Sequence, residues 1–169
     1  LYCVLKPKPC LRRGGQGLSP ALVGQGMTAF SRAHALTDRE RAFAERMFES
    51  LGRLTWVRED QMEAVVGVSG SGPAYVFLLA EAMQAAAQRL GLPPEAARVL
   101  AAQTCLGAGR MLTESGEDAG ALRQRVTSPG GTTQAALESF ARDGFSGIVA
   151  RAIEAAAHRG AELSAQAGR

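Results

Sequence analysis

The amino-acid sequence predicts a mainly helical protein that begins with a short strand–helix–strand segment. Residues 24–31 and 54–57 have strand character, and they flank a stretch whose apolar residues recur at helical spacing. From Asp60 onward we find no strand pattern, only helical segments separated by Gly, Pro and Ser. The chain therefore combines what is typical of the end of an α/β domain with a larger helical domain.

The helix of the first segment has start and stop signals of its own. The tetrapeptide Thr37-Asp38-Arg39-Glu40 has capping-box spacing, in which a hydroxyl and a carboxylate each accept a hydrogen bond from a backbone N–H. Phe43 and Met47 repeat at helical spacing, and Gly52 ends the helix. Alternating apolar residues then predict the second strand at 54–57.

The helical part is expected to form a dimer. Its helices are predicted at residues 60–68, 72–90, 94–114, 118–126, 132–143 and 145–166. Gly91 ends one helix, and Pro93-Pro94 begin the next, where a missing N–H does no harm. The helices at 72–90 and 94–114 are apolar nearly all round, and a lone domain cannot easily cover them. We expect a homodimer through these helices; the alternative is a tightly folded, alanine-rich monomeric bundle.

Charge gives no indication of nucleic-acid binding. The formal net charge is +3, but Lys6, Lys8, Arg12 and Arg13 lie among the first 13 residues. Without these four of the 19 basic residues, 15 remain against 16 acidic ones. The rest of the chain is therefore near neutral, which disfavours a surface that follows phosphates.

Cysteine usage and hydropathy favour a cytoplasmic protein without a metal. Cys3, Cys10 and Cys105 show no Cys-x-x-Cys spacing, and there are two histidines, so neither a disulfide framework nor a metal site is indicated. The longest charge-free apolar stretch, 64–80, is interrupted by Ser, Gly and Pro. We expect no transmembrane segment and no signal peptide.

The most informative motif is Thr127-Ser128-Pro129-Gly130-Gly131-Thr132-Thr133, between two predicted helices. The helix that follows begins with N–H groups that have no partner inside the helix, and its dipole favours negative charge. The two glycines allow a ligand to approach the backbone closely. A carboxylate would suit this turn, and the alternative is a turn that only caps the helix.

A second motif, Gly67-Val68-Ser69-Gly70-Ser71-Gly72-Pro73, is expected to interrupt the helical pattern. Ser71 could cap the new helix, and the N–H groups beside it could face a second ligand group. The spacing is neither a dinucleotide fingerprint nor a hydrolase nucleophile elbow. No histidine near this motif in the sequence could act as a base, so we do not expect a serine nucleophile.

These two motifs resemble the C-terminal half of the pyrroline-5-carboxylate reductase family. Three further stretches share the resemblance: Ala102-Gln103-Thr104, Gly109-Arg110-Met111-Leu112 and Ala155-Ala156-Ala157-His158-Arg159. The resemblance runs from about residue 20 to residue 163. It implies the end of an NAD(P)-binding Rossmann domain at 20–58 and a helical dimerisation and substrate-binding domain at 59–169. Residues 1–19 form an atypical N-terminal segment.

The resemblance also implies a reaction and roles for residues. Family members reduce 1-pyrroline-5-carboxylate to L-proline with NADPH or NADH, the last step of proline synthesis, without a metal. The Thr133 hydroxyl would hydrogen-bond the ring nitrogen. The substrate carboxylate would be held by Ser128, Gly130, Gly131 and Thr132, with backbone N–H groups of Gly131 and Thr132 as donors. The nicotinamide end of the cofactor would be approached by Ser69, Gly70, Ser71 and Gly72.

The sequence departs from the family at its start. Family members usually read Arg-x-Met-Pro-Asn-x-Pro before the position of Ala21, where this chain has Gly17-Leu18-Ser19-Pro20. We therefore expect a truncated or frame-shifted product that is inactive alone. The alternative function is a non-catalytic helical dimerisation module. A dehydrogenase acting on β-hydroxy acids would need a lysine near the substrate, and no lysine follows Lys8.

Overall fold

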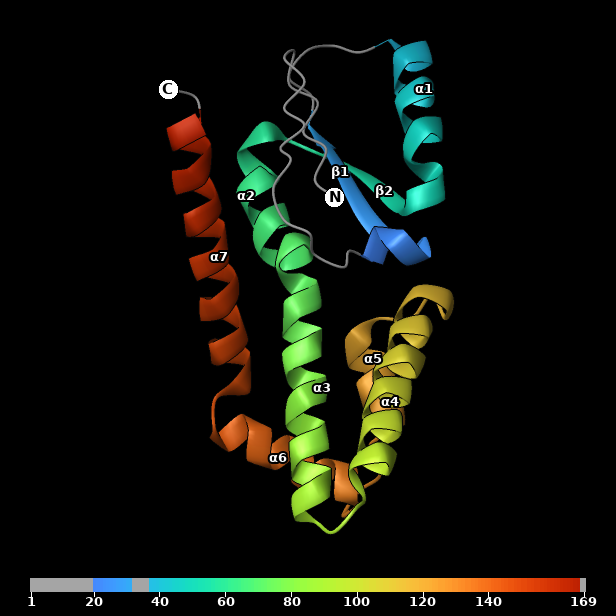
Figure 1. Cartoon of the computed structure of the whole chain (residues 1–169), viewed down its shortest axis with the longest axis vertical. Coiled ribbons are helices and arrows are strands. Elements are labelled where there is room, and N and C mark those ends of the chain that lie inside the picture. The colour runs from blue at the N-terminus through green and yellow to red at the C-terminus, as the bar shows by residue number, and fades with distance from the viewer. Residues whose placement is uncertain (1–19, 32–36, 168–169) are drawn as a thin grey trace. The chain divides into compact units, whose positions relative to one another are not determined.

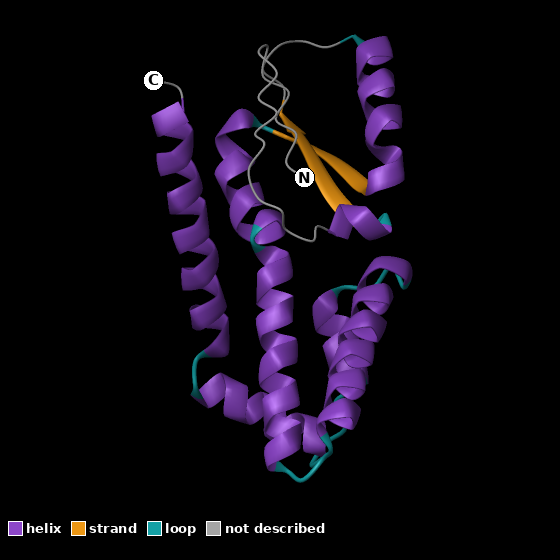
Figure 2. Ribbon diagram, in the orientation of Figure 1, coloured by secondary structure: helices purple, strands orange, loops and turns teal. Residues whose placement is uncertain are grey.

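The structure, a computed structural model, describes residues 20–31 and 37–167 (Figure 1). It confirms a mainly helical chain with two strands ahead of the helices (Figure 2). Two compact units are present. One combines the residues up to Pro73 with those from Arg151 onward, and the other is Ala74–Ala150. The N-terminal segment 1–19 lies outside the described residues.

The first unit contains a parallel strand pair joined by a helix. Its elements are the 3-10 turn η1 (Pro20–Val23), β1 (Gly26–Ser31), α1 (Asp38–Phe48), η2 (Glu49–Leu51) and β2 (Gly52–Val57). The strands are in register from Gly26 beside Gly52 to Ser31 beside Val57. Parallel strands need a crossover connection, which α1 supplies. The predicted strand–helix–strand segment is therefore confirmed as a βαβ unit.

The predicted capping box is present at the start of α1. The Glu40 N–H donates to the Thr37 hydroxyl at 3.3 Å, and the Thr37 N–H donates to the Glu40 carboxylate at 2.8 Å. This second bond is the main cause of a lowered pKa of Glu40. Two N–H groups without partners inside the helix are thus satisfied by side chains.

Aromatic side chains form the core of the βαβ unit. Phe30 on β1 is fully buried. Its ring centroid lies 5.3 Å from that of Phe48 on α1 and 4.8 Å from that of Trp56 on β2. Such ring pairs add to the free energy gained from burial. Phe30 therefore joins the helix to both strands.

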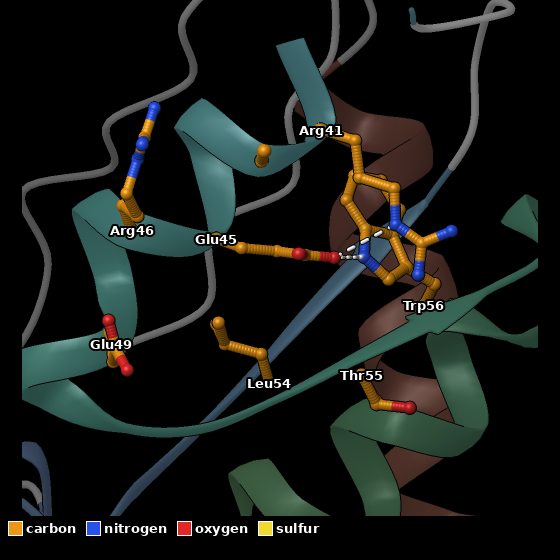
Figure 3. Close-up of a pocket in the computed structure, with 8 residues that line it drawn as sticks. Arg41, Glu45, Arg46, Glu49, Leu54, Thr55 and Trp56 are labelled. Carbon is orange, nitrogen blue, oxygen red and sulfur yellow. Dashed lines mark hydrogen bonds and ion pairs between the residues drawn. The ribbon is translucent and has the colours of Figure 1, made fainter. Parts of the chain in front are cut away.

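Trp56 also makes a polar contact on the face of α1 (Figure 3). Glu45 Oε1 accepts hydrogen bonds from Arg41 Nε at 2.9 Å and from Trp56 Nε1 at 2.7 Å. The Arg41 guanidinium lies 5.3 Å from the centre of the indole ring, a cation–π distance. The bonds from Arg41 and then Trp56 lower the pKa of Glu45. These three side chains lie beside an open groove of about 710 Å³ between α1 and β2.

The expected interruption around residues 67–72 takes the form of a π turn and a bend at Ser71 rather than a loop, and α3 begins at the predicted residue 72. The elements η3 (Glu59–Gln61), α2 (Met62–Val65), η4 (Val66–Gly70) and α3 (Gly72–Arg89) form a continuous helical run. In η4 the helix widens to a π turn, and the Ser71 N–H donates to the Val66 carbonyl oxygen at 3.0 Å. The Ser71 N–H is therefore bonded within the helix.

Close packing against α7 (Phe145–Ala167) explains the glycine in this π turn. A Cβ atom on Gly67 would lie 2.7 Å from the Ile153 carbonyl oxygen, and one on Gly160 would lie 3.2 Å from Val66 Cγ1. The C-terminal part of α7 runs beside α2 (Figure 1). The glycines thus mark a close approach of two helices, not a flexible loop.

The run Glu59–Arg89 is long and apolar enough, by length and composition alone, to cross a membrane. The sequence prediction of no transmembrane segment depends on Ser, Gly and Pro as breaks within residues 64–80. The π turn keeps the helix continuous instead. Helices that pack against another protein surface have the same composition.

The second unit has a very small core of its own. It contains most of α3, then α4 (Pro94–Glu114), α5 (Ala119–Arg125), α6 (Thr132–Arg142) and the first turn of α7. These bounds agree with the predicted helices to within two residues at each end. Within Ala74–Ala150 the buried residues are Ala97, Ala101 and Leu122. By contrast, Phe77 is 62% exposed and Leu100 is 55% exposed in the single chain.

We predict that Gly67→Ala destabilises the first unit. The added methyl group would be forced against the Ile153 carbonyl group, and overpacking of this kind costs about 1–3 kcal/mol. Thermal unfolding of the purified chain measures the effect. Gly120→Ala in α5 is the matched control, since its Cβ would meet nothing within 4 Å. Equal melting temperatures for both variants would contradict the close approach.

We also predict that the stability of the folded chain decreases at acid pH because of Glu45. Because its pKa is lowered in the folded chain, its stabilising contribution is present above the ordinary glutamate pKa of about 4.3 and is lost as the pH falls through the lower folded value. Fluorescence of Trp56, the single tryptophan, reports the loss. Glu45→Gln should weaken the pH dependence of unfolding in this acid range. An unchanged pH dependence in the variant would contradict the role of Glu45.

Candidate functional site

Residues 128–131 form a tight turn directly before α6. The Gly131 N–H donates to the Ser128 carbonyl oxygen at 3.0 Å, which closes the turn. Pro129 occupies the second position, and Gly130 has φ +70° at the third. This combination is typical of a type II turn, in which the third residue must adopt a left-handed conformation. The order Ser-Pro-Gly-Gly is therefore the order that this turn requires.

Gly131 is needed for a different reason, namely space. It is the residue that precedes α6, and its backbone is extended, with φ −84° and ψ 173°. A Cβ atom at this position would lie 2.4 Å from Ser128 Oγ. The missing side chain lets the Ser128 hydroxyl lie against the backbone at the beginning of the helix.

The start of α6 has hydrogen-bond donors that the protein does not use. No side chain caps this helix at Gly131. Among the described residues, none accepts from the N–H groups of Thr132, Thr133 or Gln134, whereas the Ala135 N–H donates to Gly131 at 3.2 Å. Such N–H groups carry the positive end of the helix dipole.

Residues with hydroxyl groups lie next to these free donors in the chain. Within the described part of the chain, the side chains of Ser128, Thr132 and Thr133 make no hydrogen bond, and Thr133 is half-buried. The first turn of α6 has no acidic residue that would neutralise the dipole. Three backbone donors and three hydroxyls therefore lie within a few residues of each other, an arrangement that suits a small carboxylate.

Two further contacts hold the turn, and sequence analysis did not find them. The Thr127 hydroxyl donates to the Arg123 carbonyl oxygen at 2.6 Å, so the turn is tied to the end of α5. The Gly130 N–H donates to Gln134 Oε1 at 2.7 Å. A glutamine at the third helical position is a known signal for such a reach back to the preceding backbone.

The structure brings Ser128, Gly130, Gly131, Thr132 and Thr133 together in this one turn. It also changes the expected donors. The Gly131 N–H, expected to bind a carboxylate, is used within the turn, so the N–H groups of Thr132 and Thr133 are the available ones. The second expected group, Ser69–Gly72, belongs to the other compact unit, at the π turn and the start of α3.

The described residues contain no glycine-rich dinucleotide turn. Such a site requires a glycine-rich turn that leads from a strand into a helix. No glycine lies between β1 and α1, and none lies between β2 and α2. The described ranges also contain no group of three or more His, Cys, Asp or Glu that could hold a metal ion.

Comparisons with known proteins agree on one family. The family model of pyrroline-5-carboxylate reductase dimerisation matches residues 59–163. A pyrroline-5-carboxylate reductase of Pseudomonas aeruginosa is 41% identical over 164 residues, which cover 96% of this chain and 59% of that protein. The reductase of Pisum sativum is 42% identical over 147 residues, covering 86% of this chain and 54% of that protein.

Solved structures give the same result. The pyrroline-5-carboxylate reductase of Coxiella burnetii superimposes with a TM-score of 0.82 at 40% identity, over 86% of this chain and 54% of that one. The Plasmodium falciparum enzyme, solved with NADP bound, gives 0.74 at 31% identity, over 83% and 55%. The chain thus spans a little over half the length of these relatives. Since the family model covers more than half of it, the chain belongs to the pyrroline-5-carboxylate reductase dimerisation family.

Proposed function

We propose that this chain is the dimerisation and substrate-holding part of a pyrroline-5-carboxylate reductase, which reduces 1-pyrroline-5-carboxylate to L-proline. The single observation that carries the proposal is the unused donor group at the start of α6, inside the family match at 59–163. On this proposal residues 20–58 are the end of the cofactor domain and residues 59–169 are the helical domain.

The substrate is a five-membered ring that carries one carboxylate and one imine. The N–H groups of Thr132 and Thr133 and the Ser128 hydroxyl would bind the carboxylate, because they are the donors that the turn leaves free. The Thr133 hydroxyl would hydrogen-bond the ring nitrogen. Reduction adds a hydride to the imine carbon and leaves a proton on the nitrogen, so this chain contributes chiefly binding and orientation.

NADPH or NADH is the proposed hydride donor of the whole protein, and the Plasmodium falciparum relative was solved with NADP. The described residues of this chain contain no dinucleotide turn of their own. We therefore expect the chain alone to bind L-proline but to lack turnover. A cytoplasmic location remains our proposal. It agrees with the near-neutral charge of the chain after its first 13 residues and with cysteines that show no Cys-x-x-Cys spacing.

A second candidate function is a dimerisation module without catalysis. It is favoured by the absence of a dinucleotide turn in the described residues and by the exposed apolar faces of α3 and α4. Titration of the purified chain with L-proline separates the two candidates. Binding that perturbs the amide signals of Thr132 and Thr133 supports the reductase site, whereas dimerisation without any such binding supports the module.

We predict that Thr133→Ala weakens L-proline binding about tenfold or more, since a hydrogen bond to a charged group contributes about 1.5–3 kcal/mol. The proline ring nitrogen is charged at neutral pH and would donate to this hydroxyl. Calorimetric titration gives the affinity. Thr113→Ala on α4 is the matched control, because the Thr113 hydroxyl bonds only to its own helix, at Gly109 and Arg110. Equal affinities in both variants would remove Thr133 from the site.

We also propose that the chain is a homodimer through α3 and α4, in line with the family match. Leu100→Lys should dissociate it, because a buried, unpaired charge in an apolar contact is strongly unfavourable. Light scattering after size exclusion measures the mass. Arg53→Lys on β2 is the control, since it keeps its charge and lies outside these helices. A monomeric wild-type chain would contradict the proposal.

A further inference from the structure

We propose that the outer edge of β2 binds the same edge of a second copy of this chain, so that the two strand pairs form one four-stranded sheet. This contact is separate from the dimer through α3 and α4, and it does not depend on the proposed function. The site is the groove between α1 and β2 (Figure 3). The groove is lined by Arg41, Ala42, Glu45, Arg46 and Glu49 of α1 and by Leu54, Thr55 and Trp56 of β2.

The outer edge of β2 has backbone groups that are left unpaired. Over the described ranges the sheet has two strands, and residues 53–57 make no backbone hydrogen bond beyond their pairing with β1. Such an edge presents a row of free N–H and C=O groups. Residues 28–31 of β1 are at most 3% exposed, whereas residues 54–57 of β2 are half-buried and three of them line the groove. The accessible edge is therefore that of β2.

β2 also lacks the features by which edge strands usually prevent further pairing. Such strands carry charged residues, proline or a β-bulge. Residues 54–57 contain no charge and no proline, and the register of β2 on β1 is unbroken from Gly52 to Val57. An edge of this kind is a template for another strand. Across a twofold axis, the β2 strand of a second copy would pair with it in antiparallel direction.

The position of α1 is compatible with such a sheet. Phe48 on α1 contacts Phe30 on β1, which contacts Trp56 on β2, so the helix lies over the strand pair. Neighbouring strands are about 4.8 Å apart, so two further strands place the second α1 about 10 Å away. Helices pack against each other at about 8–10 Å. Ala42, which is small and exposed, lines the groove on the facing side of α1 and permits this approach.

The charges on α1 favour a second copy as the occupant of the groove. On the groove side they alternate along the helix in the order Arg41, Glu45, Arg46, Glu49. An antiparallel copy reverses this order and sets basic residues against acidic ones, whereas a parallel copy would bring like charges together. Arg46 and Glu49 are exposed and make no ion pair within the described ranges. We therefore expect Arg46 to pair with Glu49 of the second copy, twice across the twofold axis.

A charge swap tests the inference, with the mass measured by sedimentation over a range of concentrations in a Leu100→Lys background. This background removes the proposed contact through α3 and α4, so the mass should rise from one chain to two as the groove contact forms. Arg46→Glu should raise the dissociation constant about three- to tenfold, because two surface attractions become repulsions. Adding Glu49→Arg should restore it. Arg39→Glu, on the same helix but outside the groove, is the matched control.

Hydrogen exchange of the β2 amides gives a second readout. In the same background, exchange at residues 53–57 should slow as the concentration increases, because paired strand edges protect their N–H groups. A mass of one chain at every concentration overturns the inference, and so does an equal effect of Arg46→Glu and Arg39→Glu. Association without slower exchange in β2 means that another surface is used and overturns it as well. None of these measurements involves L-proline, so the proposed function is tested separately.

Discussion

The stability of this chain depends on apolar helix surface that one copy does not bury. Large side chains on α3 and α4 are exposed, whereas the buried residues of Ala74–Ala150 are two alanines and Leu122. Full burial of one leucine or phenylalanine contributes about 1.5–3 kcal/mol, and a whole domain is typically stable by only about 5–15 kcal/mol. Burial of a few such side chains would therefore contribute as much free energy as the whole stability of a typical domain, and α3 and α4 depend on it. In the proposed homodimer, folding and association of this region would be a single, concentration-dependent equilibrium.

The turn before α6 shows a second kind of dependence, between helix stability and binding. Most helices satisfy their first N–H groups with a side chain, as α1 does with Thr37 and Glu40. The residue before α6 is Gly131, which has no side chain to offer, and no described residue accepts from the first three N–H groups of the helix. A bound carboxylate would take the place of the cap. The ligand would thus stabilise the helix that binds it, and order at the site would increase with occupancy.

Much of this architecture could be predicted from local sequence signals. Helical periodicity located the helices of Ala74–Ala150 to within two residues, and the Ser-Pro-Gly-Gly order predicted the turn before α6. At Gly67 the sequence predicted a flexible stretch, whereas the structure has a π turn, because a glycine can have either of two structural roles. It permits a loop, and it also permits two helices to touch, and only the position of Ile153 on α7 distinguishes them. The Gln134 contact does not follow from the hydroxyl and glycine pattern of the turn; its signal is a glutamine at the third helical position.

The π turn at Val66–Gly70 has a consequence for how α3 presents its side chains. A π turn accommodates one residue more than an α turn, and each residue rotates the helix by about 100°. Everything from Ser71 to Arg89 is therefore rotated by that amount relative to a regular continuation of α2. Natural variation that shortens this stretch by one residue would redirect the whole apolar stripe of α3, although every side chain in it remained the same. Such a constraint at a helix crossing acts on the length of this stretch as much as on its composition.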